Sequence, residues 1–285
     1  MEKIKLAIEK AKLENAKLEN VQVNVISSIE PVSLVQEQKI DGETPLANRD
    51  IDKISYNKTT VIKLDQSSLE RNRIVSHAKN NLYSGVFDSL RTQVLQKMEE
   101  NGWKTIAVVS PTPASGKTFV SINLAISIAH QPQKTAILLD LDLRRPKIAN
   151  YLGLNVAQSM NDYLQGNAKL EDLMISPGIA RLVVVPTMRP VAKSSEVLSS
   201  SKVVNLIQEL RDRYESRIVI FDAPPILNSD DAMVLLPQVD CFLLVIANGM
   251  STKAEIEEAM HYLPQEKLLG VVFNKADIEA REYYY

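Results

Sequence analysis

The sequence contains little of what cross-links a protein or fixes it in a membrane. Among its 285 residues there is one cysteine, Cys241, so no disulfide can form within the chain. Cys241 begins the apolar run 241–246, which predicts a buried thiol that packs as a small hydrophobic side chain. We therefore expect a reducing, cytoplasmic setting.

An excess of one charge and a long hydrophobic run are also missing. The 33 Lys and Arg residues against 35 Asp and Glu residues give a net charge of −2, which provides no electrostatic footprint for DNA or RNA. No window reaches the roughly 20 apolar residues of a membrane span, and the N-terminus lacks a signal-peptide core. We expect no nucleic-acid partner, and we expect any membrane contact to be made through a partner or the protein surface.

Three segments of the chain differ in pattern. Residues 1–20 place apolar side chains at helical spacing among Lys and Glu, which predicts an amphipathic helix, either solvated or docked on a partner. Residues 21–66 lack periodicity and carry scattered Pro, Asn and Asp, as a flexible linker does. The folded domain is predicted over 67–285.

Within that domain, short apolar runs alternate with amphipathic helical stretches. Apolar strands separated by helices predict an α/β fold, a doubly wound and mostly parallel sheet covered on both faces. Ligands of such sheets bind at the carboxyl ends of the strands. The predicted strands are 105–109, 135–141, 180–185, 218–222, 241–247 and 268–273, and the predicted helices are 117–130, 195–214, 230–236 and 252–263.

The segment 110–118, Ser-Pro-Thr-Pro-Ala-Ser-Gly-Lys-Thr, joins a predicted strand to a predicted helix, as a phosphate-binding P-loop does. In such a loop Lys117 reaches the terminal phosphates, Thr118 coordinates Mg²⁺, and backbone N–H groups surround the polyphosphate. Ser110 stands where the usual pattern has Gly, and a Pro-rich turn before a helix is the alternative. The expected nucleotide contacts are Ala114, Ser115, Gly116, Lys117, Thr118 and Phe119.

Acidic residues follow two of the predicted strands. Asp140 and Asp142 end the second strand and Asp222 ends the fourth. Carboxylates at strand ends facing a P-loop hold Mg²⁺ or accept a proton from an attacking hydroxyl, although a strand ending in solvated charge is the alternative. Arg144, and Arg145 beside it, are expected to bind phosphate oxygens or an acidic substrate.

Two further features lie near the C-terminus. Asn274 begins the sequence Asn-Lys-Ala-Asp after the last predicted strand, where a base-reading loop belongs. Its spelling matches the guanine-reading motif of GTPases, so guanine is an alternative to adenine. Tyr283, Tyr284 and Tyr285 end the tail 281–285; we expect them to be exposed phosphoacceptors, with a docking tail as the alternative.

These motifs together resemble the bacterial tyrosine kinases (BY-kinases) of polysaccharide synthesis and export, most narrowly the tyrosine autokinases of exosortase-linked clusters. The resemblance covers 67–285 and rests on the P-loop, the tyrosine tail, and the segments 138–146, 194–200 and 220–225. It implies ATP and Mg²⁺ as cofactors and phosphorylation of the terminal tyrosines between subunits. Lys117 would then bind the β- and γ-phosphates, while Thr118, Asp140, Asp142 and Asp222 would hold the metal and supply the base.

The resemblance also implies partners. Members without a membrane span are activated by a membrane protein related to chain-length regulators, which would keep this chain at the inner face of the membrane, and a cognate tyrosine phosphatase would reset the tail. Two departures stand out: Ser115 replaces a frequent Glu, and the segment 85–91 keeps only Arg91 of the subunit-packing motif Glu-x-x-Arg-x-x-Arg.

Two other functions remain open from the sequence. One is a partition- or Min-type ATPase that positions a cell-envelope complex; such proteins usually carry an additional Lys near the start of the loop, and 110–115 contains none. The other is a nucleotide-binding scaffold without kinase activity, which the weakened packing motif favours.

Overall fold

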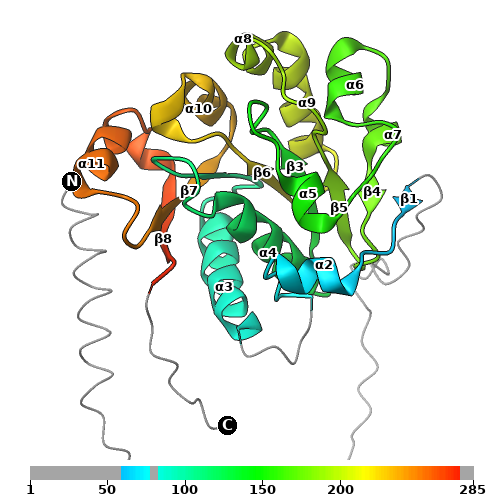
Figure 1. The fold of residues 1–285 in the computed structure, drawn as a ribbon, viewed down its shortest axis with the longest axis horizontal. Helices are drawn as coiled ribbons and strands as arrows, with labels where there is room; N and C mark the ends of the chain where they lie inside the picture. The colour runs from blue at the N-terminus through cyan, green and yellow to red at the C-terminus, as the bar shows by residue number, and fades with distance from the viewer. Residues whose placement is uncertain (1–58, 78–82, 277–285) are drawn as a thin grey trace, which may run out of the picture. The chain divides into compact units, whose positions relative to one another are not determined.

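The structure, a computed structural model, describes residues 59–77 and 83–276. The predicted N-terminal helix, most of the predicted linker and the terminal tyrosines lie outside these residues. The described part of the chain forms an eight-stranded sheet with helices on both faces (Figure 1).

The strand order in this sheet is β1-β4-β5-β3-β6-β2-β7-β8. All neighbours run parallel except β4 and β5, which are antiparallel. The predicted mostly parallel α/β sheet is therefore confirmed. The strands are β1 (Thr60–Val61), β2 (Thr105–Val109), β3 (Thr135–Asp140), β4 (Ile175–Ser176), β5 (Leu182–Val185), β6 (Arg217–Asp222), β7 (Cys241–Ala247) and β8 (Leu268–Asn274).

Helices and short turns connect the strands. They are α2 (Gln66–Arg71), α3 (Ser84–Glu100), α4 (Lys117–Ala129), α5 (Ile148–Leu152), α6 (Met160–Gln165), α7 (Leu170–Leu173), α8 (Ser194–Leu198), α9 (Ser201–Asp212), α10 (Asp231–Leu235) and α11 (Lys253–His261), with the 3₁₀ turns η2 (Ile226–Asn228), η3 (Leu236–Gln238) and η4 (Gln265–Lys267). None of the described helices is long and apolar enough to cross a membrane.

The helix predicted over 195–214 is divided into α8 and α9. Ser199 and Ser200 turn their hydroxyl groups back to the carbonyls of Glu196 and Val197. Serine side chains that bond nearby backbone groups compete with the helical hydrogen bonds, and Ser200 adopts an extended conformation here. The division follows from this local competition.

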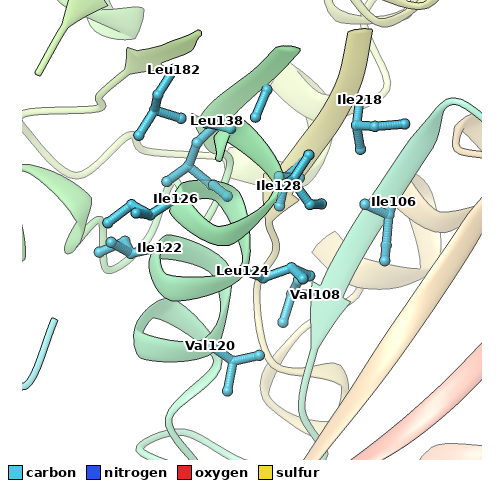
Figure 2. Packing of buried hydrophobic residues seen from close by; sticks show 14 of the residues in the cluster. Ile106, Val108, Val120, Ile122, Leu124, Ile126, Ile128, Leu138, Leu182 and Ile218 are labelled. Carbon is cyan, nitrogen blue, oxygen red and sulfur yellow. The ribbon is translucent and has the colours of Figure 1, made fainter. Parts of the chain in front are cut away.

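Helix α4 lies at the centre of one core layer. All its residues except Phe119 are buried. Its apolar side chains pack against the face of the sheet that carries Ile106, Leu138 and Ile218 (Figure 2). Successive strand side chains point to opposite faces, and β2 is buried along its whole length, so both faces of the sheet are covered. This packing fixes the start of α4 against the sheet.

Strand β1 pairs with β4, so the sheet takes in residues from the segment 21–66 that the sequence pattern assigns to a linker. In the middle of the sheet, β6 lies between β3 and β2, and Asp140 and Asp222 are register partners. The residues after β2, β3 and β6 therefore meet at one edge of the sheet.

Candidate active site

The segment between β2 and α4 turns tightly. Ala114 and Gly116 have positive φ values of 64° and 94°. The hydroxyls of Ser110 and Ser115 both donate to the carbonyl of Thr112, at 2.8 and 3.0 Å. Ser110 is thus accommodated where glycine is usual, because its buried hydroxyl is satisfied inside the turn.

Gly116 is required by its surroundings as well as by its φ angle. A Cβ atom added at this position would lie 2.0 Å from the amide nitrogen of Asn274. Gly116 precedes Lys117, the first residue of α4, so the loop leads directly into the helix N-terminus. This is the geometry in which backbone N–H groups and the helix dipole attract phosphate.

Lys117 is buried among carboxylates. Its Nζ lies 2.5 Å from Asp142 Oδ2 and 3.9 Å from Asp222 Oδ1. Burial alone lowers the pKa of Lys117, but the attraction of Asp222, Asp142 and Asp140 outweighs it, and the pKa is raised. The lysine therefore carries its charge at neutral pH.

Asp222 is fully buried at the end of β6. Its carboxylate accepts hydrogen bonds from Thr118 Oγ1 at 2.6 Å and from Ser121 Oγ at 3.2 Å. Burial raises the pKa of Asp222, opposed by Lys117 and Thr118. Ser121 was not predicted; its position three residues after Thr118 on the same helix face is the available signal.

Asp140 has one satisfied and one unsatisfied oxygen. Oδ2 accepts from the backbone N–H groups of Lys147 and Ile148, both at 2.9 Å, and so ties the start of α5 to β3. Oδ1 is buried and has no hydrogen-bond partner among the described residues. Burial first, and repulsion from Asp222 second, raise the pKa of Asp140 well above its ordinary value.

These side chains fit a magnesium ion that arrives with a nucleotide. Among the described residues, no group of three or more His, Cys, Asp or Glu side chains is arranged to hold a metal. The Thr118 hydroxyl beside Asp222 and the unpartnered oxygen of Asp140 nevertheless supply oxygen donors, which Mg²⁺ prefers. Mg²⁺ commonly takes only one or two protein carboxylates and completes its shell with phosphates and water.

A cleft of about 530 Å³ opens at this point, within the usual size range of small-molecule sites. It is lined by the predicted residues Ala114, Gly116, Lys117, Thr118, Phe119, Asp142 and Asn274. Arg145, which was predicted beside Arg144, and Lys275 of the predicted Asn-Lys-Ala-Asp motif also line the cleft. Three further cations and a tyrosine were not predicted, because only tertiary folding brings α2 and the start of α5 to the loop. These residues are Arg71, Arg73, Lys147 and Tyr151.

Arg144 is engaged outside this cleft. Its guanidinium binds the buried Asp231 through Nε at 2.9 Å and Nη2 at 3.2 Å, and its Nε also donates to Ser194. Its neighbour Arg145 lines the cleft instead. Thus, of the two adjacent arginines, Arg145 lines the cleft beside the P-loop, whereas Arg144 is held by Asp231.

The Ser194 hydroxyl donates to Asp231 at 2.6 Å. We expect Ser194→Ala to lower the free energy of unfolding by about 1.5–3 kcal/mol, because it removes a hydrogen bond to a buried carboxylate. Ser199→Ala, at an exposed site in the same segment, serves as the matched control. Urea denaturation of both variants measures the difference, and equal stabilities would contradict the assigned bond.

The last residue of β8 and the residue after it contact the P-loop. Asn274 Nδ2 donates to the carbonyl of Ser115 at 2.8 Å, and Lys275 Nζ donates to that of Ala114 at 2.9 Å. Asp277, the last residue of the predicted base-reading motif, and the tail tyrosines lie outside the described residues.

Arg91, the residue kept from the subunit-packing motif, bonds within its own chain. Its Nη1 lies 2.6 Å from Asp88 Oδ1 and 3.1 Å from Ser127 Oγ. These contacts join α3 to the last turn of α4.

No protein-family model matches the chain. Tyrosine-protein kinase CpsD of Streptococcus pneumoniae is 34% identical over 188 residues, which cover 63% of this chain and 79% of the relative. Tyrosine-protein kinase YwqD of Bacillus subtilis is 28% identical over 220 residues, covering 76% and 92%. EpsB of Ralstonia solanacearum is 32% identical over 199 residues, so that the chain spans about a quarter, 26%, of that relative.

A solved structure agrees with these relatives. The kinase domain of the Escherichia coli tyrosine kinase ETK superposes with a TM-score of 0.65 at 27% identity, covering 79% of this chain and 94% of that domain. The MinD protein of Pyrococcus horikoshii, with a TM-score of 0.50 at 23% identity, shares the fold alone. The chain belongs to the bacterial tyrosine-protein kinase family.

Proposed function

We propose that this chain is an ATP-dependent protein-tyrosine autokinase that phosphorylates Tyr283, Tyr284 and Tyr285. The observation that carries the proposal is the convergence of Lys117 and Thr118 with Asp140, Asp142 and Asp222 beside the P-loop. Membership of the tyrosine-kinase family supports the choice of tyrosine as acceptor.

Each side chain has a separate task in the proposed reaction. Lys117 exchanges its Asp142 partner for β- and γ-phosphate oxygens of ATP. Thr118, Asp222 and Asp140 would hold Mg²⁺, which would supply neutralisation of charge on the phosphates. Asp142 lines the cleft whereas Asp140 and Asp222 are fully buried, so Asp142 is the carboxylate that an incoming hydroxyl can reach.

Asp142 is therefore assigned as the base. The tyrosine oxygen attacks the γ-phosphorus, the bond from that phosphorus to the β-phosphate oxygen breaks, and ADP leaves with that bond's electron pair. The phenolic proton passes to Asp142.

The cations that line the cleft suit an acidic acceptor. Arg71, Arg73, Arg145 and Lys147 border the same cleft as Lys117. Charge-assisted bonds from these groups stabilise both the triphosphate and an acceptor segment such as Glu282-Tyr283. Asn274 contributes on the base side of the nucleotide, where adenine is the proposed base.

The cellular setting is part of the proposal. The chain acts in the cytoplasm at the inner face of the membrane, held and activated by a membrane-bound chain-length-regulator-type protein, within an exosortase-linked cluster. Subunits phosphorylate one another in trans, and a tyrosine phosphatase reverses the modification to control exopolysaccharide synthesis and export.

Incubation of the purified chain with ATP and Mg²⁺ tests the activity directly. We expect mass spectrometry to find phosphate on Tyr283, Tyr284 and Tyr285, because the tail carries the acceptors. Replacing all three by Phe should abolish incorporation, whereas Tyr262→Phe, at an exposed tyrosine outside the cleft, should not. ATP hydrolysis without tail phosphorylation would favour a Min-type ATPase, and binding without either reaction would favour a scaffold.

A further inference from the structure

One residue of the P-loop, Ala114, is held in a backbone conformation that it disfavours. Ala114 carries a side chain yet has a φ of 64°, and Gly116 has a φ of 94°. The left-handed region is strained for residues other than glycine and is occupied when the surroundings enforce it. Ala114 is exposed, so packing around its methyl group does not supply this restraint.

The restraint comes from the end of β8. Asn274 Nδ2 donates to the Ser115 carbonyl at 2.8 Å, and Lys275 Nζ donates to the Ala114 carbonyl at 2.9 Å. We call these two side chains the carbonyl latch. Their support is firm, because β8 pairs with β7 through Asn274 and the Asn274 carbonyl accepts from Asn248 N at 2.9 Å.

The backbone of Lys275 is also strained where it contacts the loop. Its φ of 55° makes it a third left-handed residue at the point of contact, after Ala114 and Gly116. The Asn274 amide fills the space that a Gly116 Cβ would occupy. The two segments therefore approach one another as closely as a glycine allows.

The hydrogen bonds to the carbonyls of Ala114 and Ser115 also fix the orientation of the N–H groups that follow them. In a trans peptide the C=O of one residue and the N–H of the next point in opposite directions. Bonding the carbonyls of Ala114 and Ser115 toward β8 therefore turns the N–H groups of Ser115 and Gly116 the other way. Backbone N–H groups of this loop are the groups that surround phosphate.

We propose that Asn274 and Lys275 are positioning residues that hold the P-loop open for the triphosphate, independently of any contact with the base. This deepens the proposed function and rests on it, because the latch matters only where the loop binds phosphate. The shared ligand chemistry is a polyphosphate, with or without a nucleoside.

Inorganic tripolyphosphate separates positioning from base recognition, because it has no base. Titration calorimetry with Mg-tripolyphosphate and with MgATP compares wild-type protein and Asn274→Ala, a change that removes no charge. We expect both affinities to fall by about tenfold, the effect of losing a well-formed hydrogen bond in a site. The control Asn167→Ala, in a surface turn, should change neither, and thermal unfolding should confirm that both variants are folded.

Lys275→Met tests the second half of the latch, with Lys147→Met as a charge-matched control in the same cleft. We expect Lys275→Met to weaken tripolyphosphate binding more than Lys147→Met does, and Lys275→Arg to restore part of the loss. Equal losses of tripolyphosphate affinity in the two Met variants would overturn the proposed role of the latch. An Asn274→Ala variant that loses affinity for MgATP but keeps its affinity for tripolyphosphate would overturn it as well. Wild-type protein that binds MgATP but no tripolyphosphate would also overturn it, and wild-type protein that binds neither would overturn the proposed function with it.

Discussion

Lys117→Met is expected to lower autophosphorylation by about 10²-fold or more, because it removes the buried cation that is proposed to bind the transferred phosphate. No other cation among the described residues is held between Asp142 and Asp222. A radiolabelled ATP assay with phosphate mapping on the tail measures the loss. The matched control is Lys253→Met, at a lysine whose side chain is 79% exposed and far from the loop in sequence.

The same substitution is expected to destabilise the fold. Removing one partner of a buried ion pair leaves uncompensated charge, here on Asp142 and Asp222, and typically costs about 3–5 kcal/mol. Lys117→Arg distinguishes this loss from the loss of chemistry, because it keeps a cation beside the two carboxylates. We expect it to recover most of the stability but little phosphotransfer. Full activity in a folded Lys117→Met variant would refute the proposed role.

Much of the fold follows from features that lie within single segments. The runs 106–109 and 218–221 are apolar throughout, as strands buried on both faces are, and both lie in strands of the central sheet. The carboxylates of Asp140 and Asp222 stand directly at strand ends, so parallel pairing alone is enough to bring them together. For these residues the local sequence pattern and the observed position in the sheet agree.

The remaining features depend on contacts that no local pattern records. Strand β1 is two residues long and exposed, so its sequence carries no apolar run. Arg71 and Arg73 reach the cleft only because α2 packs on α5. Arg144 and Arg145 have the same chemistry, and the choice between them is made by Asp231, a residue 87 positions away in the chain from Arg144. Similarly, the hydrogen bond from Asn274 to the P-loop spans 159 positions.

Asp140→Asn is expected to stabilise the nucleotide-free protein at neutral pH while it lowers kinase activity. The carboxylate of Asp140 is buried, one of its oxygens has no partner in the described structure, and Asp222 lies opposite it. The side-chain oxygen of the substituted amide can still accept from Lys147 and Ile148, while the repulsion from Asp222 disappears. Removal of this buried negative charge and of its repulsion from Asp222 should add about 1–3 kcal/mol to the free energy of unfolding, which urea denaturation resolves. Stability gained at the expense of activity is typical of a functional site.

The pH dependence of this gain gives the prediction a second readout. The pKa of Asp140 is raised by burial and by Asp222, so the folded protein binds this proton more tightly than the unfolded chain, whose Asp has an ordinary pKa of 3.8. Wild-type stability should therefore fall as pH rises from that value through the raised pKa, whereas the amide of the Asp140→Asn variant has no such proton to lose. The advantage of Asp140→Asn over wild type should be largest at neutral pH and should shrink as the pH approaches 4. Asp212→Asn, at an exposed helix end, should show neither effect. An advantage that stays constant across this range would mean that Asp140 is not the strained carboxylate of the site.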